Sequence, residues 1–379
     1  MPPSGARMIA RKLAMLIATP MLAIASDVRE SFDASVAYAP AAVMVDGRTE
    51  LVYEIHLTNF SAADLAVDAL VVLNGDTGAE LRAFRGAELA RRFAPVRGGD
   101  ANAAAVLAPG RSALVFVEID MATSVPTVLA HRIEYAESGH DAKLVAAGPR
   151  ITVDRRAPPS LGPPLRGGPW VAVYSPDWPR GHRRVVYAID GRARIPGRFA
   201  IDWVKVDDAG HIAKGDADLP TNTLGYGADV LAVADARVAG MRDDMAESPS
   251  VAGNSKHAIG DAAGNYIALD LGDGRYAFYE HLEPGSVRVK TGDVVHHGQV
   301  IGSLGFTGDS TGPHLHFHVA DGDSPLGAEG VPFAFDRYRL VGRYDDIGKL
   351  GSARWNAPPA KPATTREHER PAPNDVVMF

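Results

Sequence analysis

The chain has 379 residues, a formal net charge of −7 and no cysteine. Its length suits two domains of ordinary size, and its acidic balance gives no general electrostatic reason to bind nucleic acid. Without cysteine, disulfides, thiolate chemistry and cysteine-based zinc sites are excluded, so a bound metal must be held by His, Asp or Glu side chains.

The N-terminus has the pattern of a secretory signal peptide. Basic residues within positions 7–12 precede an apolar run from Leu13 to Ala25, which ends in small residues. The run is too short to span a bilayer of about 30 Å, and no second such segment follows. We therefore expect residues 1–25 to be removed on export, leaving a periplasmic or extracellular protein without a membrane span.

Residues 26–155 have the pattern of an antiparallel β-sandwich. Short β-rich runs, such as Glu50–Leu57, Leu70–Leu73 and Ser112–Ile119, alternate with polar turns. Repeated strands at this spacing are typical of a sandwich. The only helix that the pattern allows is a short one near residues 87–93, and no catalytic group of residues is evident here.

Two further segments differ in composition from the rest. Residues 156–180 are rich in Pro and Gly, which disfavour helices and central strands, so we expect a linker there. Residues 346–379 include a Pro-rich stretch without apolar periodicity, which predicts a disordered tail. A second domain is then expected over residues 181–345.

A β-hairpin is predicted near the middle of this second domain. Asn265–Leu271 alternates, turns at Gly272–Gly274, and returns through Arg275–Leu282. Short Gly/Asp connections between alternating runs are a strong hairpin signal. Because side chains repeat every two residues along a strand, we expect Tyr279 and His281 to share a face.

The most informative strand follows a Gly-rich turn and carries three histidines. His314, His316 and His318 stand at alternate positions, so their imidazoles project from one face of the strand. Three histidines on one face favour a zinc site, since neutral imidazole binds zinc and a catalytic site keeps one position open for water.

Four motifs make this domain recognisable. They are Tyr279–Leu282 (YEHL), Val289–Val295 (VKTGDVV), Gly298–Gly302 (GQVIG) and Thr307–Phe317 (TGDSTGPHLHF). Together they resemble the lysostaphin/LytM-type zinc metallopeptidases over roughly residues 198–319. The resemblance implies an all-β fold, an antiparallel sheet with a groove, and a zinc-dependent endopeptidase acting on peptidoglycan peptides.

The resemblance also implies roles for individual residues. His316 matches a zinc ligand, and His281 and His314 match the histidines that orient the attacking water and stabilise the oxyanion. Asp202 matches a second ligand, from a His-x-x-x-Asp motif. However, Arg198 stands where that motif has its histidine. A guanidinium has no acceptor lone pair for a metal and stays protonated, so Arg198 cannot be a ligand.

Three explanations for Arg198 remain open. Another histidine replaces the missing ligand, either His182 on the preceding strand-like segment or, less directly, His211. Alternatively, two ligands are too few, and the domain is a degenerate one that binds wall peptides or regulates another hydrolase. Finally, Arg198 binds a substrate carboxylate and the metal is held in another geometry.

Two further features bear on function. The segment between Val238 and Gly264 is longer than a hairpin needs, and we expect this loop to line the groove. Val289–Gly302 also resembles half of a biotinyl or lipoyl carrier domain, but the preceding hairpin lacks the modifiable Lys that such domains need. The leading expectation is therefore a zinc endopeptidase of the cell wall.

Overall fold

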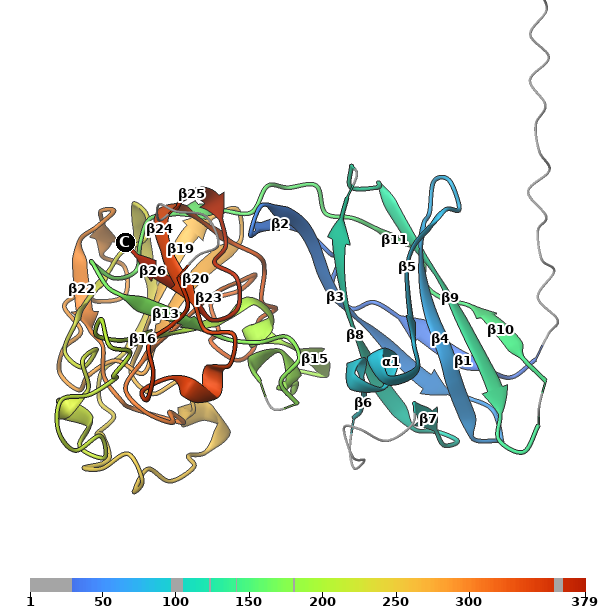
Figure 1. The fold of residues 1–379 in the computed structure, drawn as a ribbon, viewed down its shortest axis with the longest axis horizontal. Helices are drawn as coiled ribbons and strands as arrows, with labels where there is room; N and C mark the ends of the chain where they lie inside the picture. The colour runs from blue at the N-terminus through green and yellow to red at the C-terminus, as the bar shows by residue number, and fades with distance from the viewer. Residues whose placement is uncertain (1–28, 97–104, 123, 141, 180, 358–363) are drawn as a thin grey trace, which may run out of the picture.

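The computed structural model describes residues 29–379 apart from 97–104, 123, 141, 180 and 358–363 (Figure 1). The predicted signal peptide lies outside these residues. Within the described part of the chain no helix is long and apolar enough to cross a membrane. The predicted all-β class is confirmed: strands dominate, and the α-helix α1 (Gly86–Arg92) falls where the sequence allows a short one.

The N-terminal half is a sandwich of two antiparallel sheets. One has the order β1-β3-β8-β6, with β2 added to β3, and the other has the order β10-β9-β4-β5, with β11 on β9 and β7 on β4. Alternate residues of β3, such as Leu51, Tyr53 and Ile55, are buried between the sheets, as the period of two requires. The strands are β1 (Phe32–Ser35), β2 (Ala42–Val45), β3 (Arg48–Asn59), β4 (Leu65–Asn74), β5 (Glu80–Arg85), β6 (Phe93–Pro95), β7 (Val106–Leu107), β8 (Ser112–Met121), β9 (Val128–Glu137), β10 (Leu144–Ala147) and β11 (Ile151–Thr152).

The C-terminal half is built on one large sheet. Its order is β12-β24-β26-β13-β16-β23-β20-β19-β18-β21, with β25 on β24. The strands are β12 (Ser160–Leu161), β13 (Trp170–Val173), β16 (Ile201–Lys205), β18 (Ala236–Arg242), β19 (Tyr266–Gly272), β20 (Arg275–Glu280), β21 (Val294–Val295), β23 (Leu315–Ala320), β24 (Ala334–Arg343), β25 (Thr364–Glu369) and β26 (Asp375–Met378).

Shorter elements surround this sheet. Two small antiparallel pairs and several 3-10 helices connect its strands and cover parts of it. The strand pairs are β14 (Tyr187–Ile189) with β15 (Arg192–Arg194) and β17 (Asp229–Leu231) with β22 (Val300–Ser303). The 3-10 helices are η1 (His182–Arg184), η2 (Pro196–Phe199), η3 (Pro220–Asn222), η4 (Ile259–Asp261) and η5 (Ile347–Lys349).

The centre of the large sheet separates an apolar face from a polar one. Trp203, Phe317 and Tyr279 lie on neighbouring strands and are fully buried in the main core. The register places Asp202 of β16 opposite His316 of β23, and His316 opposite Glu280 of β20. Because successive side chains point to opposite faces, these three polar residues share the face away from that core.

The predicted disordered tail, residues 346–379, is wrong for residues 346–357 and 364–379. The first part contains η5 and the buried Trp355. Residues 364–369 form β25, and β26 lies between β24 and β13 inside the large sheet. Val376 and Val377 are fully buried there. The apolar run of β26 is short, and the residues before it are rich in Pro. The average composition of this segment therefore does not indicate a strand.

The predicted linker also contains strands. Residues 160–161 form β12, and β13 lies in the interior of the large sheet between β26 and β16. Trp170 is fully buried. The Pro and Gly residues end just before this Trp-Val-Ala-Val run. Their unfavourable effect on central strands therefore applies to residues 156–169 and not to 170–173.

The two halves pack against each other through buried charges. Glu54 of β3 forms ion pairs with Arg183 and Arg198 of the C-terminal half, at 2.7 and 2.9 Å, and all three side chains are at most 5% exposed. Figure 1 shows β15 close to β3 and β8 of the sandwich, where Ile195 packs on Leu114 and Phe116. The halves are therefore joined by a desolvated interface as well as by the chain.

Candidate metal centre

The site is centred on the carboxylate of Asp202. His316 Nδ1 lies 2.9 Å from its Oδ1, and His314 Nε2 lies 3.2 Å from the same oxygen. His314 immediately precedes β23, so both imidazoles project from the polar face of the sheet, as the predicted alternation requires. The structure thus brings together three of the four residues that the sequence assigns to the site.

A fourth side chain, His182, reaches the other oxygen of the carboxylate. Its Nε2 lies 3.1 Å from Asp202 Oδ2, and its ring is 4.7 Å from the ring of His316. The segment is a 3-10 helix and not the predicted strand. Gly197 of η2 makes room for it, because a Cβ at this glycine would lie 2.8 Å from the Cβ of His182.

Arg198 points away from this carboxylate. Its guanidinium binds Glu54 at 2.9 Å, Glu329 at 2.8 Å and the Gly330 carbonyl oxygen at 2.8 Å, and the side chain is 2% exposed. It is therefore occupied at the domain interface and is not free to hold a substrate carboxylate. His211, the other substitute considered, is exposed and pairs with Asp207 at 3.0 Å.

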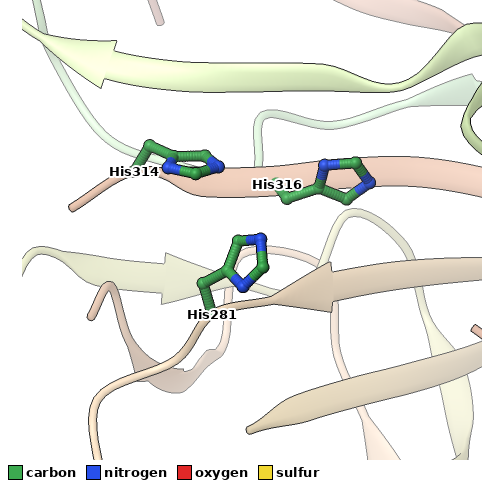
Figure 2. A group of neighbouring side chains, drawn as sticks. All are labelled: His281, His314 and His316. Carbon is green, nitrogen blue, oxygen red and sulfur yellow. The ribbon is translucent and has the colours of Figure 1, made fainter. Parts of the chain in front are cut away.

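His281 completes the group from the end of β20. Its φ of 64° is uncommon for a non-glycine residue and turns the chain out of the strand. The ring lies 4.9 Å from that of His314 and 5.9 Å from that of His316. Figure 2 shows His314 and His316 on one strand, with His281 rising towards them.

The prediction that Tyr279 and His281 share a face is wrong. Tyr279 is fully buried in the core, where its hydroxyl accepts a hydrogen bond from the Val233 amide at 2.9 Å. The positive φ at His281 breaks the two-residue period just after Glu280, so His281 returns to the polar face. Glu280 and His281 consequently lie beside the same groove.

Hydrogen bonds fix the orientation of the two flanking histidines. His281 Nδ1 donates to the Thr307 carbonyl oxygen at 2.8 Å, and His314 Nδ1 donates to the Gly312 carbonyl oxygen at 2.7 Å. In both rings Nε2 is left for the site. A neutral ring held in this way presents Nε2 as a proton acceptor.

Burial and the charges in the site shift the pKa values of its groups in different directions. Burial alone would raise the pKa of Asp202, but facing His182 and His314 holds this pKa well below its usual value. Burial, together with His314 and His316, lowers the pKa of His281 well below its usual value. Burial also acts to lower the pKa of His314, but the Asp202 carboxylate outweighs it and raises this pKa.

The donor atoms of His182, Asp202 and His316 fit a single metal ion. One ligand atom from each lies within 4.8 Å of the others, and the two imidazole–carboxylate distances are 3.1 and 2.9 Å. Tetrahedral ligands at about 2.0–2.2 Å from zinc are separated by about 3.3 Å. Two imidazoles and one carboxylate are also a donor set that catalytic zinc uses.

The site opens into a groove of about 350 Å³. His182, His281 and His316 line it, and the long loop before Gly264 contributes Lys256 and Ile259, as the sequence predicts for this loop. A second cavity of about 400 Å³ lies between the two halves and is also lined by His182.

Sequence reasoning gave no role to two residues beside this site. Glu280 and His318 line the same groove and are 4% and 1% exposed. The alternation of β23 correctly places His318 on the same face as His316. The strand register, which the sequence does not give, places the Glu280 carboxylate directly opposite His316.

Comparison with known proteins identifies part of this domain. Residues 221–327 match Peptidase family M23. Peptidoglycan DD-endopeptidase ShyA of Vibrio cholerae is 41% identical over 74 residues, which are 19% of this chain and 17% of the relative. Lysostaphin of Staphylococcus simulans is 51% identical over 55 residues, which are 14% of this chain and 11% of the relative.

Similar solved structures include two catalytic domains. That of lysostaphin from Staphylococcus simulans is 26% identical and covers 33% of this chain and 85% of that one, with a TM-score of 0.20. That of the prophage-encoded protein EnpA from Enterococcus faecalis, solved as a point mutant, is 21% identical and covers 46% and 92%, with a TM-score of 0.25.

The matched region contains His281, His314 and His316 but begins after Asp202. The chain spans less than a fifth of the length of the curated relatives it matches. The predicted resemblance is nevertheless confirmed: residues 221–327 match the M23 peptidase family, and lysostaphin is among the relatives.

Proposed function

We propose that this protein is an exported, zinc-dependent endopeptidase that cleaves peptide cross-links of bacterial peptidoglycan. The family match and the names of the relatives, which include peptidoglycan endopeptidases, support the reaction and the substrate. The signal-peptide pattern of residues 1–25 supports export, since the substrate lies outside the cytoplasm.

The observation that carries the proposal is the position of His182. Its Nε2 faces one oxygen of Asp202 while His316 Nδ1 faces the other. His182, Asp202 and His316 would thus hold the zinc, and His182 supplies the donor that Arg198 cannot. Zinc bound there would polarise the scissile carbonyl and lower the pKa of water towards 7.

His281 and His314 would carry out the proton transfers. The Thr307 carbonyl holds the proton of His281 on Nδ1, so Nε2 accepts a proton from the attacking water. His314 is similarly anchored by Gly312, and its Nε2, when protonated, donates to the oxygen that develops negative charge. The groove beside them excludes part of the surrounding water and receives the extended peptide.

Metal content and cleavage together test the proposal. The mature chain and its variants His182→Ala, Asp202→Ala and His316→Ala would be analysed by inductively coupled plasma mass spectrometry, with His211→Ala as the matched control. Each of the three variants should lose the zinc ion held at Asp202, because one lost bond removes a large part of the affinity of a three-ligand site. The control should keep it.

Digestion of purified, cross-linked peptidoglycan would be followed by chromatography of the released fragments. The wild type and His211→Ala should release uncross-linked peptides, and the three ligand variants should not. A wild-type chain that binds peptidoglycan but holds no zinc and releases no fragments would instead be the degenerate, wall-binding domain.

A further inference from the structure

A second group of metal-binding side chains lies next to the first, on the same face of the sheet. Glu280, His316 and His318 each offer a ligand atom, and these atoms lie within 4.8 Å of one another. In the register of β20 and β23, Glu280 is directly opposite His316, and Phe278 is directly opposite His318. The three ligands therefore come from two paired strands inside the large sheet.

Three polar atoms of this second group are buried without hydrogen-bond partners. Among the described residues, Glu280 Oε1 and both ring nitrogens of His318 are buried and make no hydrogen bond. The shortest approach between the two side chains, from His318 Nδ1 to Glu280 Oε1, is 3.6 Å. This separation exceeds a hydrogen bond, and buried polar groups without partners cost free energy.

The side chains are also held in place without the help of a ligand. The His318 ring stacks on Phe278, with centroids 4.7 Å apart and planes inclined by 12°. On the opposite face of the same strands, Phe317 and Tyr279 are packed in the core. The strands and the stacking thus hold the unpaired atoms of Glu280 and His318 towards the groove, which both residues line.

His316 belongs to both groups, and its ring has two nitrogens that can act as ligands. Its Nδ1 faces Asp202 at 2.9 Å. Figure 2 shows another nitrogen of the ring directed along β23, away from His314. An imidazole that has lost its N–H proton can bind one metal ion on each nitrogen, so the two sites can be filled at the same time.

We propose that Glu280, His316 and His318 form a second metal site, which takes a divalent transition-metal ion such as zinc and shares His316 with the first site. Two imidazoles and one glutamate form a zinc-binding set in their own right. The ion would satisfy the unpaired atoms of Glu280 and His318 and add positive charge to the wall of the groove. The inference depends on the proposed function only through His316.

Metal stoichiometry tests the second site separately from the first. The full chain would be stripped with chelator, dialysed against buffered zinc and analysed by mass spectrometry. The variants are Glu280→Gln and His318→Phe, which preserve shape and the stacking on Phe278, and Asp202→Asn for the first site. His257→Ala is the control, because its ring pairs with Asp309 on the exposed loop. Thermal unfolding followed by circular dichroism would establish that each variant is folded.

We expect two zinc ions per chain in the wild type and in His257→Ala, and one in each of the other three variants. A cobalt titration should show two successive absorption changes in the wild type and one in His318→Phe. One zinc in the wild type that survives Glu280→Gln and His318→Phe but not Asp202→Asn would overturn the second site and leave the proposed function standing. One zinc that survives Asp202→Asn but not His318→Phe would support the second site and overturn the first.

Discussion

Arg183 of the C-terminal domain donates from Nε to Glu54 of the N-terminal sandwich at 2.7 Å, and it directly follows His182 in the chain. Its Nη2 also donates to the Tyr53 and Val117 carbonyl oxygens, at 2.8 and 3.0 Å, and the guanidinium pairs with Glu118. The sandwich thus anchors the short 3-10 helix that carries His182, the histidine closest to Asp202 Oδ2.

Changing Arg183→Ala should weaken both the fold and the metal site. Removing one partner of a buried ion pair costs about 3–5 kcal/mol, because the other charge is left buried. The loss of the anchor should also free η1 and reduce zinc affinity at least tenfold. Urea unfolding and zinc titration would measure the two effects.

The matched control for Arg183 is Arg48→Ala, in which an exposed pair with Asp120 is lost. Exposed pairs contribute about 0–1 kcal/mol, so stability and zinc affinity should stay near those of the wild type. If Arg183→Ala bound zinc as tightly as Arg48→Ala, the sandwich would have no part in positioning His182.

His281→Ala and His314→Ala should keep the zinc at Asp202 but lose turnover. Both rings face the site without belonging to the His182, Asp202 and His316 group, and roles in proton transfer or oxyanion stabilisation are worth a factor of about 10² or more. Initial cleavage rates on cross-linked peptidoglycan, beside bound zinc, would measure this. His296→Ala, an exposed histidine, is the control, and equal rates in all four proteins would make the two histidines structural.

Changing Arg198→His should destabilise the protein without adding a metal ion. The buried guanidinium holds Glu54 and Glu329. A shorter side chain would remove one of the two arginine partners of each carboxylate, at a cost of several kcal/mol. Zinc content per folded chain should stay at the wild-type value, because His182 already provides the ligand. A gain of zinc in this variant would show that the native site lacks one.

Acid should weaken the sandwich through His131. Its Nδ1 donates to the Pro149 carbonyl oxygen, so Nε2 accepts from the Tyr53 hydroxyl at 2.7 Å. Burial lowers the pKa of His131 to about 4 from its usual 6.5. The neutral ring therefore contributes stability that is present above pH 6.5 and is lost as the pH falls towards 4, about 3 kcal/mol in all.

The measurement is the free energy of unfolding of the full chain between about pH 7 and pH 4, the interval that the two pKa values of His131 define. His131→Gln keeps a side chain able to bond but cannot be protonated, so its stability should fall less steeply over this interval. Parallel curves for the two proteins would mean that His131 does not titrate on unfolding.

The sequence alone predicts the chemistry of β23 well, because a strand places alternate side chains on one face whatever surrounds it. His314, His316 and His318 are therefore correctly placed together. The position of His182 could not be predicted in this way. It depends on the 3-10 helix η1, which packs against Gly197 and whose Arg183 forms an ion pair with Glu54 of the other domain.

The wrong prediction that His281 shares a face with Tyr279 has a local cause. One positive φ ends the strand period, and nothing in the alternation of Arg275–Leu282 signals it. The strands of the C-terminal segment, β25 and β26, were missed for a non-local reason. The apolar run of β26 is too short to indicate a strand by itself. It becomes a strand by pairing with β13 and β24.

The place of β26 also governs when the large sheet can be completed. Trp170 and Val377 are neighbours in the sheet, although more than half the chain separates them. During synthesis, the sandwich can fold before β26 has been made. The sheet beneath Asp202 and His316 stays open on one side until β26 has emerged. A chain interrupted between β23 and β26 would carry every histidine of the site and still lack the strand that joins β13 to β24. The sheet that carries the candidate site is thus completed only by residues 375–378.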